Sequence, residues 1–221
     1  MHRWRAVTVA LCVALLVQGL LATPAGAATA SARSILLALP VAYEGGSSTY
    51  QRSYFTHWID ADHDCQDTRA EVLIAESLAP ITYTSSSHCY VSKGRWYSQY
   101  DGATWTVASD VDIDHMVPLK EAWESGARGW TSTDRTRYAN DLGFYASLIA
   151  VTDNVNQSKS DRDPVDWMPP LASDRCQYAM NWVQVKYRWR LSINPAERTK
   201  LSSLLSGTCG AKVISVPARA R

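Results

Sequence analysis

The most informative stretch of this chain is Asp112-Ile-Asp-His-Met-Val-Pro118. Acidic and apolar residues alternate here, which predicts a strand that turns Val111 and Ile113 toward a core and the acids toward the opposite face. Acids on one face repel each other unless a cation or solvent relieves the repulsion. At the end of this strand a carboxylate (Asp114) and an imidazole (His115) stand side by side.

A second polar segment, Asp153-Asn-Val-Asn-Gln-Ser-Lys159, follows a short apolar strand predicted over Leu148–Thr152. Its side-chain oxygens suit a hard divalent cation, and the neutral imidazole of His115 can take a proton from water. A phosphodiester is a substrate that uses both groups. The two segments together indicate a metal-dependent nuclease.

The order of strand, loop, short strand and ligand-bearing helix resembles the ββα-metal core of HNH endonucleases. Asp114-His-Met-Val-Pro-Leu119 and Asn156-Gln-Ser-Lys-Ser-Asp161 carry this resemblance. The chain is similar in particular to the secreted, disulfide-bearing HNH family of filamentous soil bacteria. Further motifs extend the likeness over roughly residues 54–209: Asp67-Thr-Arg-Ala-Glu-Val-Leu73, Tyr100-Asp-Gly102, Ala122-Trp-Glu-Ser-Gly-Ala127, Tyr138-Ala-Asn-Asp-Leu142, Asp161-Arg-Asp-Pro164 and Trp167-Met-Pro-Pro170.

The resemblance implies a role for each group of the predicted site. His115 matches the general base, Asp114 the first metal ligand, and Asn156 the ligand from the helix. The implied cofactor is one divalent ion, Mg²⁺ first and Mn²⁺ or another divalent ion as alternatives, with waters and the scissile phosphate completing the coordination. An imidazole pKa near 6.5 leaves His115 mostly neutral at neutral pH, and activity is expected to fall below about pH 6.

The residue that orients the catalytic histidine is open in this sequence. HNH cores usually place an asparagine about nine residues before the helix ligand, and that position here is Ser147. Either the Ser147 hydroxyl replaces it, or Asn140 reaches in from the preceding helix.

Three basic residues are candidates for binding the substrate phosphate: Lys159, Arg162 and Arg69. Each also has a structural alternative. Lys159 and Arg162 follow a helix, where cations are often solvated, and Arg69 could pair with neighbouring acids on the first turn of a helix. The stretch Lys186–Arg190 interleaves cations with aromatic residues, which fits either a nucleic-acid contact or the solvated side of a helix.

The first 27 residues have the pattern of a secretory signal peptide, with Arg3 and Arg5 before an apolar run and Ala25-Gly-Ala27 at its end. The chain is therefore expected to be secreted and extracellular, and no later apolar run is long enough for a membrane span. Removing this segment deletes two arginines and no acid, so the net charge moves from +1 to about −1. Contacts with DNA or RNA must then come from local basic patches.

The predicted class is α+β, with an HNH core embedded in a single disulfide-stapled domain that has C-terminal helices. Residues 28–53 are expected to form a loosely ordered N-terminal segment, and residues 54–221 the nuclease domain. A capping box at Thr68 and Glu71 predicts a helix that stops before Pro80.

Four cysteines remain after the predicted signal peptide, and an even number in an exported chain indicates disulfides. Of the three possible pairings, Cys65–Cys89 and Cys176–Cys209 are favoured because each closes a local segment. Loops of this size contribute about 3–4 kcal/mol each in the chain-entropy model.

A rival interpretation is a non-catalytic secreted module that binds cell wall or carbohydrate through exposed tryptophans. We favour core positions for the eight that remain, namely Trp58, Trp96, Trp105, Trp123, Trp130, Trp167, Trp182 and Trp189. Asp60-Ala-Asp-His-Asp64 resembles a calcium loop, but Cys65 stands where such a loop needs glycine for its turn. Low sequence specificity is expected because no helix-turn-helix or zinc finger is visible.

Overall fold

The computed structural model describes residues 28–221. The predicted signal peptide, residues 1–27, lies outside the described residues. Within residues 28–221, no helix is both long and apolar enough to cross a membrane.

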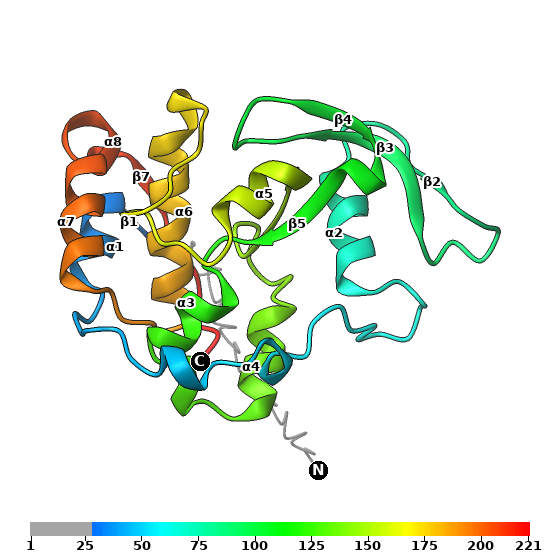
Figure 1. Ribbon diagram of the computed structural model, residues 1–221. Coiled ribbons are helices and arrows are strands. Elements are labelled where there is room, and N and C mark those ends of the chain that lie inside the picture. Colours follow the sequence, from blue (N-terminus) through cyan, green and yellow to red (C-terminus); the bar gives the residue numbers. More distant parts are fainter. Residues whose placement is uncertain (1–27) are drawn as a thin grey trace, which may run out of the picture.

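The described chain is an α+β fold with two disulfides (Figure 1). Its helices are α1 (Ala32–Leu37), α2 (Thr68–Glu76), α3 (Leu119–Glu124), α4 (Ser132–Ala139), α5 (Asp153–Lys159), α6 (Arg175–Arg188), α7 (Pro195–Leu204) and α8 (Gly207–Ala211). Its strands are β1 (Thr29–Ser31), β2 (Thr82–Tyr83), β3 (Val91–Tyr97), β4 (Thr104–Val107), β5 (Val111–His115), β6 (Leu148–Thr152) and β7 (Val213–Ser215).

Strands β5 and β6 form an antiparallel pair at the centre of the molecule, from Val111↔Thr152 to His115↔Leu148. Opposed residues in such a pair share a face. One face packs apolar residues of both strands against α2 and β3, which confirms the predicted alternation. The other face carries Asp112 and Asp114, and α5, which follows β6 directly, lies across it (Figure 1).

A larger core lies beyond α5, where α1, α3, α4, α6 and α7 pack together (Figure 1). Helix α6 is its centre, and its Trp182 side chain is fully buried. Two disulfides tie segments at the edges of the fold: Cys176–Cys209 joins α6 to α8, and Cys65–Cys89 joins the loop before α2 to the turn before β3. The predicted pairing is confirmed.

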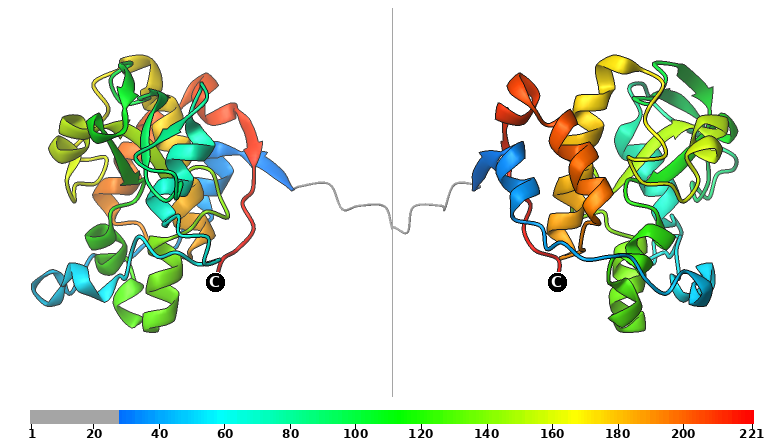
Figure 2. Two further views of the ribbon diagram at one scale, coloured as in Figure 1. Left: turned by 90° about the vertical axis from the view of Figure 1, so that its right-hand side faces the viewer. Right: turned by 60° about the vertical axis from the view of Figure 1, so that its left-hand side comes forward.

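The N-terminal segment differs from the expected loose order over residues 28–53. Strand β1 pairs with β7 near the other end of the chain, and both lie side by side in Figure 2. Helix α1 then buries Ile35 and Leu36 in the larger core. The sequence did not reveal this because the partner strand is almost the whole chain away, and a helix of six residues shows little periodicity.

The start of α2 also differs from the prediction. Asp67 is the N-cap, and its carboxylate accepts from the backbone N–H of Ala70. Thr68 instead donates its hydroxyl to Asn140, so Thr68 and Glu71 form no capping box. An aspartate is as good an N-cap as a threonine, and here it stands one residue earlier.

The aromatic residues proposed for the rival binding module are interior. Six of the eight tryptophans are buried, and Trp58 and Trp105 are half-buried. The proposed nucleic-acid stripe is also wrong: Lys186 is fully buried between Glu121 and Glu197, and Arg188 pairs with Asp141. These cations neutralise interior carboxylates and leave no exposed stripe along α6.

Candidate active site

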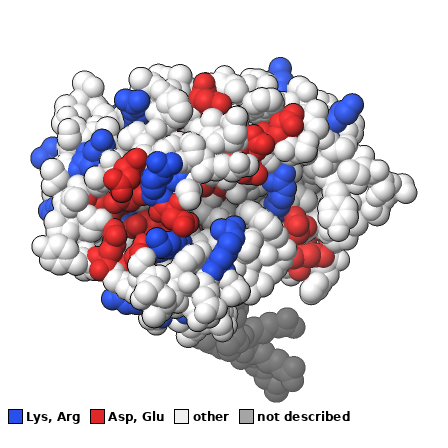
Figure 3. All heavy atoms as spheres, in the orientation of Figure 1, with Lys and Arg blue, Asp and Glu red and all other residues white. Residues whose placement is uncertain are grey.

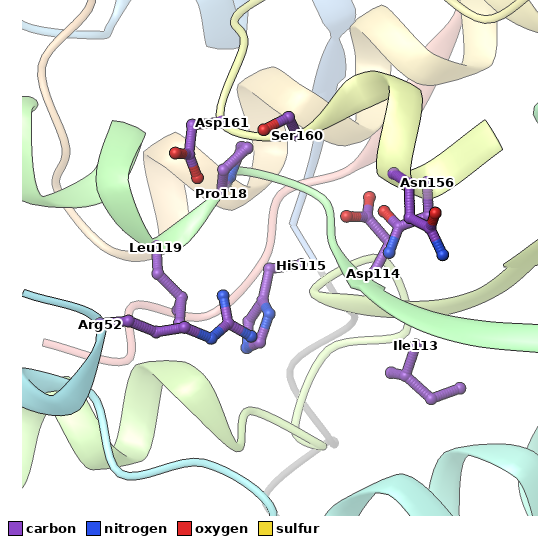
Figure 4. A pocket seen from close by; sticks show the side chains of 10 residues that line it. Arg52, Ile113, Asp114, His115, Pro118, Leu119, Asn156, Ser160 and Asp161 are labelled. Atoms are coloured by element: carbon purple, nitrogen blue, oxygen red, sulfur yellow. The ribbon is translucent and has the colours of Figure 1, made fainter. Parts of the chain in front are cut away.

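One pocket of about 350 Å³ brings together the three groups predicted to do chemistry. Asp114 and His115 reach it from the end of β5, and Asn156 reaches it from α5 (Figure 4). The remaining lining residues are Arg52, Ile113, Pro118, Leu119, Gln157, Ser160 and Asp161. Two segments that are distant in sequence thus meet around one solvent-accessible space.

His115 is held by three neighbours. Its Nε2 lies 2.9 Å from the carbonyl oxygen of Ala139. The ring of Trp58 stacks against the imidazole at 5.6 Å between centroids, and the Tyr138 ring lies nearly parallel to it at 6.4 Å. A carbonyl can only accept, so Nε2 carries the hydrogen and Nδ1 keeps its lone pair.

Burial lowers the pKa of His115 to about 3, although the hydrogen bond to Ala139 works in the opposite direction. The positive charge of Arg52 adds to the lowering. The ring is therefore neutral over the whole physiological range. The expected loss of activity below about pH 6 has no basis in the protonation of His115.

Neither residue considered for orienting the imidazole contacts it. The Ser147 hydroxyl donates to Asp141, at 2.7 Å. The Asn140 side chain accepts from the N–H of Ile59 and from Thr68, and its amide nitrogen donates to the carbonyl oxygen of Thr136 in α4, at 2.8 Å. Neither alternative for the open orienting role makes this contact, and the imidazole instead donates its hydrogen bond to the backbone carbonyl of Ala139.

Asp114 is almost fully buried, with 6% of its surface exposed. Lys159 donates to both carboxylate oxygens, at 3.0 and 2.7 Å, and the Tyr100 hydroxyl donates to Oδ2 at 2.6 Å. Burial raises the pKa of Asp114 and lowers that of Lys159, while the attraction between the two charges opposes both shifts. This pair relieves the repulsion expected among the acids of β5.

The three predicted phosphate-binding cations do not line the pocket. Lys159 is fully buried and also donates to the backbone carbonyl of His115, at 2.9 Å. Arg69 donates to the carbonyl oxygens of Ala108 and Val111, which ties α2 to β5. Arg162 faces a neighbouring pocket rich in acids. The assignments of Lys159 and Arg69 are corrected, because structural contacts occupy both side chains, whereas Arg162 is exposed and its role in binding phosphate stays a prediction.

The donor atoms at the pocket fit a weakly held divalent cation. A carboxylate offers about four lone-pair positions, and hydrogen bonds from Lys159 and Tyr100 leave one on Oδ1 of Asp114. The Asn156 amide nitrogen donates to Asp112 at 3.1 Å, so its carbonyl oxygen stays available to a cation. Two hard oxygen donors suit Mg²⁺ or Mn²⁺, which keep several waters. The nearby ammonium of Lys159 opposes strong binding.

A second acidic group, Asp60, Asp62 and Asp64, lies outside the pocket. One oxygen from each comes within 4.8 Å of the others. Cys65 follows them with φ of 75°, so the sharp turn that seemed to require glycine forms with cysteine. The conformation alone therefore does not exclude a calcium loop, and these three acids do not line the pocket that holds His115.

Residues 67–203 match the protein family described as "GmrSD restriction endonucleases, C-terminal domain", which is more than half of the chain. The chain belongs to this family. A relative described as "Uncharacterized secreted protein", from Arthroderma benhamiae, is 45% identical over 196 residues, covering 86% of this chain and 93% of the relative. No solved structure matches the chain.

The part of the chain that matches the GmrSD C-terminal domain family contains Asp114, His115 and Asn156. Two residues that sequence reasoning missed, Arg52 and Trp58, lie before it and still reach the site. No sequence motif around either residue indicates a role in the site. Tyr100 was visible within the motif Tyr100-Asp-Gly102, but nothing in that motif indicated its contact with Asp114.

Proposed function

We propose that this protein is a secreted, metal-dependent endonuclease of the HNH type that hydrolyses phosphodiester bonds of DNA. The observation that carries the proposal is the meeting of Asp114, His115 and Asn156 in one open pocket. The order of β5, β6 and α5 around that pocket agrees with a ββα-metal core. Membership of a nuclease-related family supports the same chemistry.

His115 is the general base in this proposal. Its Nδ1 takes a proton from a water molecule as the water oxygen attacks phosphorus, and the bond from phosphorus to the 3′-oxygen breaks. The departing 3′-oxygen takes up a proton from solvent water. The products carry a 5′-phosphate and a 3′-hydroxyl. The contacts with Ala139, Trp58 and Tyr138 fix the ring before substrate arrives, which is the geometric requirement for this role.

Asp114 and Asn156 would hold the divalent ion, Mg²⁺ or Mn²⁺, which when bound supplies a Lewis acid for the phosphodiester. Tyr100 and Lys159 orient the carboxylate of Asp114 and balance its charge. Asp112 orients the amide of Asn156. The ligands are thus positioned by side chains that do not themselves need to touch the substrate.

The charge distribution limits how this protein can hold DNA. The face shown in Figure 3 has acidic and basic side chains interspersed, with no continuous basic surface across it. Affinity for DNA must then come from a few local contacts, and binding should weaken with salt in proportion to the number of phosphates contacted. RNA carries the same phosphodiester and is the alternative substrate.

Several observations support export. The relative from Arthroderma benhamiae is described as secreted. Two disulfides tie the fold, and such bonds persist in oxidising compartments. The signal-peptide pattern of residues 1–27 agrees with both.

A plasmid assay tests the proposed function. Wild-type protein with Mg²⁺ or Mn²⁺ should nick supercoiled plasmid, EDTA should stop the reaction, and DNA ligase should reseal the nicks without prior treatment by a kinase. His115→Ala should lower the rate by about 10²–10⁴-fold. His63→Asn is the matched control, because His63 is exposed and does not line the pocket.

Equal activity of wild type and His115→Ala would contradict the assignment of the base. If neither protein cleaves DNA or RNA with any divalent ion, the non-catalytic interpretation takes its place.

A further inference from the structure

Arg52 stands apart from the other basic residues near the proposed active site. It belongs to a short 3-10 turn, η2 (Arg52–Tyr54), in the N-terminal part of the chain. Among the residues that line the pocket, it is the one lysine or arginine. Figure 4 shows its guanidinium beside the imidazole of His115.

Other arginines of this protein use their guanidinium groups to stabilise the fold. Arg69 donates to two backbone carbonyls, and Arg135 donates to the carbonyls of Tyr54 and Trp130. Arg188 forms an ion pair with Asp141 at 2.7 Å. Arg52, in contrast, is exposed and forms no ion pair within residues 28–221. Its structural contact is the hydroxyl of Tyr50, so no acidic partner among the described residues neutralises its charge.

The backbone that carries Arg52 is nevertheless held firmly. Phe55, directly after the turn, is fully buried in the larger core. The ring of Tyr54 stacks on Trp123 at 5.1 Å between centroids, and Arg135 donates to the carbonyl of Tyr54 at 3.2 Å. The turn thus presents the guanidinium at the pocket from an anchored position, which reduces the entropy lost on binding.

The charges of the pocket residues other than Arg52 do not neutralise a bound phosphodiester. The charge of Asp114 is balanced by Lys159, and the ring of His115 is neutral. Asp161 also lines the pocket, forms no ion pair within residues 28–221, and adds an acidic side chain that a phosphate must face. A phosphodiester brings one negative charge, and more accumulates on its nonbridging oxygens during attack by water. In Figure 4, Arg52 lies on the side of His115 away from Asn156. A guanidinium is well suited to phosphate oxygens, since its N–H groups form a planar fork.

Resting on the proposed function, we infer that Arg52 binds a nonbridging oxygen of the scissile phosphodiester and stabilises the charge that develops on it. The active site then extends beyond the region that matches the family, because the N-terminal segment supplies a residue that touches the substrate.

Cleavage by Arg52 variants tests this inference. Arg52→Ala should lower kcat/KM on a DNA duplex by about 100-fold, the scale seen when one transition-state donor is removed. Arg52→Lys should recover part of the loss, because it keeps the charge without the fork. Arg33→Ala is the matched control: Arg33 is an equally exposed arginine on α1 and does not line the pocket. Thermal unfolding of each variant should match wild type.

A duplex with one phosphorothioate of defined stereochemistry separates substrate contact from a structural effect. Sulfur in place of the oxygen that Arg52 contacts should lower the cleavage rate of wild type, and this loss of rate should be smaller in Arg52→Ala. For the other diastereomer, the ratio of the phosphate rate to the phosphorothioate rate should be the same in wild type and in Arg52→Ala. An unchanged pattern for both diastereomers would overturn the contact even if the variant is slow. Arg52→Ala within threefold of wild type, with His115→Ala inactive, overturns the role of Arg52 alone. A wild type that cleaves nothing overturns the proposed function and this inference together.

Discussion

His115 is constrained by neighbours that each fix a different property of its ring. The carbonyl of Ala139 sets which nitrogen carries the hydrogen, the ring of Trp58 sets the ring plane, and burial sets the charge. In the role proposed for His115, a ring held in this way needs no reorientation when substrate binds. The low pKa of His115 has a disadvantage for this role, because a weaker base provides less driving force for removing a proton from water. A bound phosphodiester anion would raise the pKa and offset part of this.

The first prediction concerns the charge of His115. Its folded pKa is lowered from 6.5 to about 3, so the ring stays neutral as the pH falls from 8 to 5. The imidazole signal that disappears from the NMR spectrum of His115→Asn should therefore keep its chemical shift over this range. A midpoint near pH 6.5 for that signal would contradict the buried, neutral ring.

The second prediction concerns the buried pair of Lys159 and Asp114. Lys159→Met removes the cation and leaves a buried carboxylate without its partner, which should reduce the free energy of unfolding by about 3–5 kcal/mol. Urea unfolding measures this loss. The double variant with Asp114→Asn should recover much of it, because the unpaired charge is gone. Additive losses in the two single variants would show that the groups do not interact.

At the scale of elements, the edge of β6 shows how α2 supports the site. Strand β6 pairs with β5 on one side, and Glu76 at the end of α2 accepts from the backbone N–H of Ala150, at 2.8 Å. The carboxylate thus satisfies a donor that an edge strand would otherwise leave unpaired. Helix α2 thereby fixes the strand opposite Asp114 and His115.

The third prediction follows from the pKa of Glu76, which burial raises from 4.5 to about 7. Between these values the folded state keeps a proton that the unfolded state loses, so the free energy of unfolding falls as the pH rises. The stabilisation is complete below pH 4.5 and is lost as the pH rises through 7. Glu76→Gln stays neutral and can accept the same hydrogen bond. From pH 4 to pH 8 it should gain about 2–3 kcal/mol relative to wild type in urea unfolding. Parallel pH curves for the two proteins would refute this.

The sequence allowed some elements to be predicted closely and others not at all. The predicted bounds of β6 agree with the structure, because a continuous apolar run ends at a polar segment. The start of α7 carries a capping box at Asn194 and Glu197, a signal that lies within a few residues of sequence. The pairing of β1 with β7 was invisible, since it depends on residues far apart in the chain.

The same division applies to the candidate site. Asp114, His115 and Asn156 could be selected by residue type and motif, and the structure places them around one pocket. Their supporting contacts could not be selected. A backbone carbonyl such as that of Ala139 has no sequence signal, and Lys159 looked like a cation for substrate until its burial was known.

At the scale of the whole molecule, two disulfides reinforce two different regions. Cys65–Cys89 closes the loop beside the smaller core, and Cys176–Cys209 ties α6 to α8 at the larger one. Their sequence separations, 24 and 33 residues, are long enough for a substantial restriction of the unfolded chain.

The fourth prediction is that each disulfide contributes separately. Replacing both cysteines of either pair by serine should lower the free energy of unfolding by about 3–4 kcal/mol. Chemical unfolding of the two double variants, with wild type in reducing buffer as a comparison, measures this. A loss in the reduced wild type no larger than that of one double variant would mean that only one of the bonds contributes.

The pairing of Thr29 with Ser215 has a consequence for how the chain reaches its final form. Translation starts at the amino end, so the first strand emerges long before the strand that completes its sheet. Helix α1, which follows it, must likewise wait for α6 and α7. Strand β1 and helix α1 can therefore take their final places only after β7 has been synthesised. A nascent chain that ends before β7 would leave β1 without its partner strand.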